Sequence, residues 1–106
     1  KKLAALGDVK LAIFAGKLVH DSDSDIDVLI AGDDISTIKL KNLMKSLERE
    51  NGTSLSYTAM SFNDFYYRLS VKDRFITDLL GCKKEIVIDE QGLLSAEKAH
   101  QDSDNS

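Results

Sequence analysis

The sequence predicts an α+β (α/β) fold, a mixed β-sheet of about four strands with helices packed mainly on one face. Two observations lead to this prediction. Short apolar runs bounded by glycine or polar residues alternate with segments of helical period, in the order β, β, α, β, α, β. The chain has 106 residues, of which 42% are hydrophobic and 30% are charged. That is enough for one domain with one modest core.

The first expected strand runs from Val9 to Ala15 and ends at a turn made by Gly16. Both of its faces carry apolar side chains, so we expect it to lie in the centre of the sheet. Residues 1–7 before it resemble the last turns of a helix that is closed by Gly7. After a short polar connection, a second strand is expected from Asp25 to Ala31.

Caps and glycines bound the elements that follow. Ser36 is an N-cap candidate for a helix, and Asn51-Gly52 ends that helix. Ser61, three residues before Asp64, resembles the start of a second helix with a capping box. These signals predict, in chain order, a helix over Ser36–Glu50, a strand over Thr53–Met60, helices through Leu69 and over Lys72–Leu80, and a strand over Lys84–Ile88.

We therefore expect one domain over residues 8–94. Residues 1–7 would be the end of a preceding helix or a linker, as in a domain cut from a longer chain, and residues 95–106 would be a disordered polar tail. The single cysteine, Cys82, cannot form an internal disulfide. No signal peptide and no long apolar run is present, so we expect a cytoplasmic protein with no membrane contact.

The charge of the chain argues against a general nucleic-acid-binding surface. The net charge is −4 and the pI is about 5.1, whereas phosphate binding needs clustered Lys and Arg. Any contact with DNA would have to come from an upstream domain that this sequence does not include.

Two carboxylates give the sharpest chemical signal. Asp25 and Asp27 are two residues apart in the expected second strand, so their side chains should point to one face of the sheet. Carboxylates held that close repel each other unless a cation lies between them. The pattern therefore predicts a divalent cation at the start of this strand.

These residues belong to a longer motif. A glycine after an apolar strand, followed by Ser24-Asp25-Ile26-Asp27-Val28-Leu29-Ile30, resembles the signature of minimal nucleotidyltransferases of the DNA polymerase β-like superfamily. The likeness is closer still to prokaryotic proteins in which such a domain follows a winged-helix DNA-binding domain. It extends over Val9 to Ile88, and the further stretches that carry it are Leu29-Ile30-Ala31-Gly32-Asp33, Ser56-Tyr57-Thr58-Ala59-Met60, Asp64-Phe65-Tyr66-Tyr67-Arg68-Leu69 and Asp73-Arg74-Phe75.

The resemblance implies a reaction and a set of residues for it. Asp25 and Asp27 would be the catalytic carboxylates that bind Mg²⁺, and Gly16, Lys17 and Ser24 would contact a nucleoside triphosphate. The metal would neutralise phosphate charge while a hydroxyl acceptor attacks in line and takes the nucleotidyl group.

Two departures from the family pattern lead to a second hypothesis. The turn reads Gly16-Lys17, where the family has two small residues that let the backbone approach the phosphates. Thr53–Met60 contains no Asp or Glu, where active members carry a third carboxylate. The alternative is a catalytically inactive ligand-sensing or dimerisation domain of a transcriptional regulator, which would act as a homodimer. A protein-interaction domain without a ligand is a third, plainer hypothesis.

Other candidates have simpler interpretations. The Asp-rich loop is no EF-hand, because Ile26 and Gly32 stand where that loop needs Gly and Glu. A lone loop histidine such as His20 is usually exposed. Aromatic residues at helical spacing are usually core, and arginines four residues from aspartates usually form surface pairs. The residues concerned are Phe62, Phe65, Tyr66 and Tyr67, and the pairs Arg68–Asp64 and Arg74–Asp78.

Overall fold

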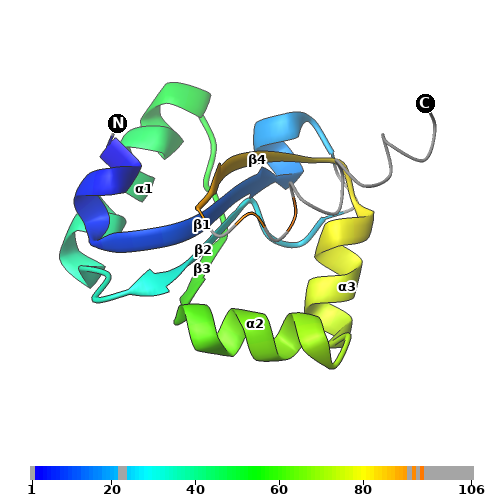
Figure 1. Ribbon diagram of the computed structural model, residues 1–106. Coiled ribbons are helices and arrows are strands. Elements are labelled where there is room, and N and C mark those ends of the chain that lie inside the picture. The colour runs from blue at the N-terminus through cyan, green and yellow to red at the C-terminus, as the bar shows by residue number, and fades with distance from the viewer. Residues whose placement is uncertain (1, 22–23, 91, 93, 95–106) are drawn as a thin grey trace, which may run out of the picture.

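The computed structural model describes residues 2–21, 24–90, 92 and 94 (Figure 1). Its centre is a four-stranded sheet with the strand order β3-β2-β1-β4. β1 is antiparallel to both of its neighbours, while β2 and β3 are parallel. The sheet is therefore mixed, and the predicted α+β class is confirmed. The strands are β1 (Asp8–Ala15), β2 (Val28–Asp33), β3 (Tyr57–Met60) and β4 (Lys84–Asp89).

The helices begin where the sequence places caps. The hydroxyl of Ser36 accepts a hydrogen bond from the N–H of Lys39, and Gly52 ends the helix at a φ of 68°. Ser61 accepts from the N–H of Asp64, which confirms the expected second start. The helices are α1 (Thr37–Asn51), α2 (Phe62–Ser70) and α3 (Arg74–Gly81), with two short 3₁₀ helices, η1 (Lys2–Leu6) and η2 (Gly16–Val19).

Helices cover both faces of the sheet, which corrects the prediction that they lie mainly on one face. α1 and η1 pack on one face against Val28 and Ile30, and α2 and α3 pack on the other against Leu29 and Ala31 (Figure 1). The physical reason is that β1 and β2 are central and apolar on both faces, so each face has to be removed from water. The central position of β1 is as expected.

A bulge in β1 shifts the alternation of its side chains. The register with β2 changes between Val9 and Leu11, so these two residues pack on opposite faces although they are two apart in sequence. Lys10 at the bulge lies 3.3 Å from Asp8 and 3.7 Å from Glu90. The hydrogen bond that the Lys10 ammonium donates to the Asp8 carboxylate, more than the nearby charges, raises the pKa of Lys10.

Two sequence expectations concern the ends of the chain. The segment before β1 is the short 3₁₀ helix η1. The expected polar tail over residues 95–106 lies outside the described residues. None of the described helices is long and apolar enough to cross a membrane.

Candidate functional site

The two motif carboxylates lie in the loop before β2, not within the strand. β2 begins at Val28, so the expected strand over Asp25 to Ala31 starts three residues later than predicted. Without strand geometry the two side chains do not share a face. Asp27 is only 3% exposed, whereas Asp25 is exposed.

Asp27 connects three segments of the chain. One oxygen of its carboxylate, Oδ1, accepts a hydrogen bond from the N–H of Lys17 at 2.7 Å, and the other, Oδ2, accepts from the N–H of Ser56 at 2.8 Å. Its own N–H donates to the carbonyl of Ser56, and its carbonyl accepts from the N–H of Ala15, both at 2.8 Å. Asp27 therefore ties the end of β1 and the start of η2 to the residue that precedes β3.

Gly16 makes room for this carboxylate. Its φ is 51°, in the left-handed region that favours glycine. A Cβ at this position would collide with the Asp27 Oδ1 atom and would lie 3.0 Å from the Ile26 carbonyl oxygen. The absence of a side chain at Gly16 therefore allows the Asp27 carboxylate to approach the backbone.

Lys17 and Ser24 also contact protein atoms. The Lys17 ammonium donates to the carbonyl of Ser54 at 2.8 Å, a second link between η2 and the chain before β3. The Ser24 hydroxyl donates to the carbonyl of Ile26 at 2.8 Å and accepts from the N–H of the same residue at 3.3 Å. Both predicted nucleotide-binding side chains therefore organise loops in this conformation.

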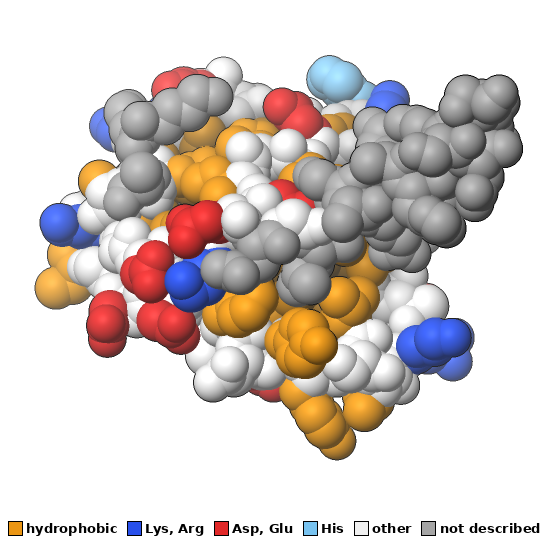
Figure 2. Space-filling model, viewed as in Figure 1, with side chains coloured by type: hydrophobic (Ala, Val, Ile, Leu, Met, Phe, Trp, Pro, Cys, Tyr) orange, Lys and Arg blue, Asp and Glu red, His pale blue; other side chains and the backbone are white. Residues whose placement is uncertain are grey.

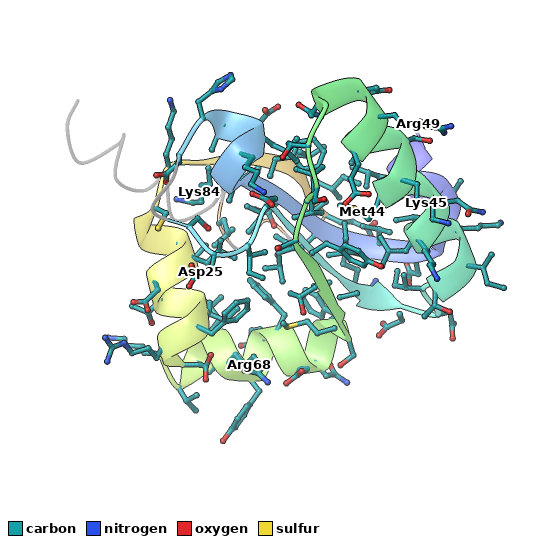
Figure 3. The ribbon with its side chains drawn as sticks, turned by 180° about the vertical axis from the view of Figure 1, so that it is seen from behind. Asp25, Met44, Lys45, Arg49, Arg68 and Lys84 are labelled. Atoms are coloured by element: carbon teal, nitrogen blue, oxygen red, sulfur yellow. The ribbon has the colours of Figure 1, made fainter. Side chains whose placement is uncertain are left out.

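Asp25 lies beside α3 rather than among other predicted ligands (Figure 3). Together with Ser24 and Ile26 it forms one wall of a cleft of about 460 Å³. The opposite wall comes from the last turns of α3 and the residue after them. It includes Thr77, Asp78 and Cys82. The cleft is open and has a mixed polar and apolar lining, and the side chains that line it are Ser24, Asp25, Ile26, Phe75, Thr77, Asp78, Leu79 and Cys82.

This set of donors fits a chelated Mg²⁺ poorly. Magnesium prefers six oxygen ligands in octahedral geometry and keeps several of them as water. Asp27 is buried and both of its oxygens already accept backbone N–H groups, so it offers no hydrated face. β3 contributes no carboxylate. Among the residues that the structure describes, no three His, Cys, Asp or Glu side chains gather where they could hold a metal ion.

Of the other residues considered in the sequence, some lie in the core and some on the surface. Phe65 is fully buried, as expected, whereas Tyr66 and Tyr67 are 52% and 64% exposed, so for these two the core interpretation is wrong. Tyr66 instead stacks on Phe62, with 6.4 Å between the ring centroids. Both arginine pairs form, at 3.2 Å for Arg68–Asp64 and 3.5 Å for Arg74–Asp78. His20 is exposed, as expected.

The hydrogen-bond donors to Asp27 and the neighbours of Asp25 could not be predicted from the sequence. The N–H groups of Lys17 and Ser56 carry no sequence signal, because every residue except proline has one. Thr77 and Asp78 approach Asp25 only because α3 packs on the same face of the sheet as α2. The left-handed turn at Gly16 was the one local hint, since a glycine there points to a close approach.

We expect the substitution Asp25→Asn to leave folding unchanged. No hydrogen bond joins the Asp25 side chain to the rest of the described chain, and the side chain is exposed. The free energy of unfolding, measured by urea denaturation, should change by no more than about 0.5 kcal/mol. A loss well above that would reveal a structural role for this carboxylate.

The surface seen in Figure 2 agrees with the acidic composition. Asp and Glu side chains gather on the left of this face, while Lys and Arg side chains lie scattered over it. Comparison of the chain with protein families, with curated proteins and with solved structures finds no match.

Proposed function

We propose that this chain is a nucleotidyltransferase-like domain without nucleotidyl transfer activity, which serves as a ligand-sensing or dimerisation domain of a transcriptional regulator. The proposal rests on the burial and the hydrogen bonds of Asp27. The motif's second carboxylate is buried, and both of its oxygens accept backbone N–H groups. The assignment to a regulator rests on the resemblance to domains that follow a winged helix.

The electrostatics of the cleft support the same proposal. A triphosphate carries several negative charges and needs cations around it. The lining of the cleft beside Asp25 instead includes a second acidic residue, Asp78, which pairs with Arg74 at 3.5 Å, and the Lys17 ammonium donates to a carbonyl oxygen. A nucleotide would meet repulsion there unless a metal ion came with it.

The experiment is an NMR titration of the labelled protein with MgCl₂ and then with each nucleoside triphosphate. We expect the amides of Gly16, Lys17, Asp25 and Asp27 to show no saturable shift, because Asp27 has no free face for a metal ion. Asp25→Asn is the matched control, since it removes the exposed carboxylate without touching the hydrogen bonds of Asp27. Shifts that saturate, require both metal and triphosphate, and vanish in Asp25→Asn would overturn the proposal.

Saturable shifts that need both metal and triphosphate would favour the active alternative, a Mg²⁺-dependent nucleotidyltransferase. The exposure of Asp25 at the mouth of a cleft is the observation in its favour. In such an enzyme Asp25, and Asp27 after a local rearrangement, would hold the metal, which would supply charge neutralisation at the phosphates. Lys17 would have to leave Ser54 to reach a phosphate.

A further inference from the structure

The two edges of the sheet are built differently. β4 at one edge carries Lys84, Glu85 and Asp89, and its register with β1 shifts between Ile86 and Ile88. Charges and bulges of this kind keep an edge strand from pairing with another chain. β3 forms the other edge, and the whole stretch Thr53–Met60 contains no charged residue and no proline. The β3 edge has none of these protections.

The outer side of β3 has unpaired backbone groups. The N–H of Val28 donates to the carbonyl of Ser56, and Val28 lies opposite Tyr57 in the parallel ladder. In such a ladder alternate residues turn both N–H and C=O toward the neighbouring strand. Thr58 therefore faces β2, while Tyr57 and Ala59 turn their backbone groups outward. No described residue bonds to these outward groups.

We propose that two copies of this chain pair through the outer edges of β3, antiparallel about a two-fold axis at Thr58. In this register Tyr57 of each copy lies opposite Ala59 of the other. Each such pair exchanges two N–H···O bonds, so all the outward groups of Tyr57 and Ala59 are satisfied. The two sheets become one continuous sheet with the dimer axis between the β3 strands.

The side chains of this register are complementary. Tyr57 and Ala59 lie opposite Val28 and Ile30, so they are on the α1 face of the sheet, where both are exposed. The ring of Tyr57, a residue that is 39% exposed, would lie against the small Ala59 of the second copy. On the other face the two Thr58 side chains would lie opposite each other, a favourable cross-strand pair. No like charges meet along the edge.

The proposed two-fold contact also limits the assembly to two copies. A two-fold contact uses the β3 edge of both copies, so among the described strands the edges left on the joined sheet are the two β4 strands. These edges are charged and bulged, which stops further pairing. The assembly is thus a dimer and not a fibre. The biological role of this contact, as the dimerisation surface of a regulator, rests on the proposed function. The contact itself does not involve Asp25 or Asp27.

The test compares Ala59→Pro with Ala59→Ser by sedimentation equilibrium over a wide range of protein concentration. Proline removes the outward N–H of residue 59 in both copies, and an edge strand tolerates it where that N–H faces solvent. It also keeps Thr58 extended. Serine retains the N–H at similar size. We expect a reversible dimer for the natural chain and for Ala59→Ser, and a dimer at least about tenfold weaker for Ala59→Pro.

Hydrogen exchange gives a second readout that does not depend on a variant folding. The amides of Tyr57 and Ala59 should become protected as the concentration of the natural chain rises, while the amide of Ile86, which faces outward on the opposite edge, should not change. A chain that stays monomeric to millimolar concentration would overturn the inference. So would a dimer in which these two amides exchange freely, or one that is equally strong in a folded Ala59→Pro variant. None of these readouts involves metal or nucleotide, so the proposed function can fail without this inference failing.

Discussion

Replacing Asp27 by alanine should destabilise the domain by about 2–5 kcal/mol. The substitution leaves the N–H groups of Lys17 and Ser56 without acceptors at a position that is 3% exposed. Both hydrogen bonds are part-buried, and a hydrogen bond to a charged group contributes about 1.5–3 kcal/mol. Since a domain of this size is stabilised by about 5–15 kcal/mol in total, the loss should be visible as a large shift of the urea midpoint.

Two further variants separate this role from that of a metal ligand. Asp27→Asn keeps the size of the side chain but turns an amide NH₂ group toward one of the two N–H donors, so we expect an intermediate loss. Asp25→Ala, two residues away, should cost little. A metal ligand would behave in the opposite way, because removing its charge relieves repulsion in the metal-free protein. If Asp27→Ala unfolds at the same urea concentration as the natural chain, the structural role is wrong.

Gly16→Ala should cost about 2–4 kcal/mol. One part of the loss is the left-handed backbone, which an L-residue adopts at a cost of about 1–2 kcal/mol. The other part is the collision of the new Cβ with the Asp27 Oδ1 atom, which forces the carboxylate away from the N–H of Lys17. The measurement is again urea denaturation, with the amide shift of Lys17 as a local reporter.

Gly52→Ala is the matched control for this substitution. Gly52 also has a left-handed φ, of 68°, but a Cβ there meets no atom within 4 Å. Its cost should therefore be limited to the backbone part. Equal losses in the two variants would show that the contact with Asp27 contributes nothing, and would contradict our account of the turn. A double variant, Gly16→Ala with Asp27→Ala, should lose less than the sum of the single losses, because both remove the same hydrogen bond.

Much of the local structure could be predicted from the sequence. Ser36 and Ser61 cap the helices that were expected after them, and Gly52 ends α1 in the left-handed conformation. The order of the main elements and the central place of β1 are also as predicted. These signals are local, since a cap needs a hydroxyl and an N–H only three residues away, and a helix needs a period of a few residues.

The candidate site could be predicted only in part. The glycine turn and the two aspartates were identified, and the structure places Gly16, Lys17 and Asp27 together. The expectation of two carboxylates on one face was wrong, because it assumed that the strand begins at Asp25. A strand boundary depends on which backbone groups find partners on neighbouring strands, and those partners are distant in sequence.

By itself the sequence determined the α+β class, the succession of helices and strands, their caps, and a motif of glycine and two aspartates. The tertiary structure decided that helices cover both faces and that Asp25 faces α3. It also decided that the Asp27 carboxylate accepts the N–H of Ser56, 29 residues along the chain. The physical reason is the distance along the chain over which each kind of interaction acts. Capping and periodicity act within a few residues, whereas the acceptors of a buried N–H, and the cover of an apolar face, are settled only when distant segments pack together.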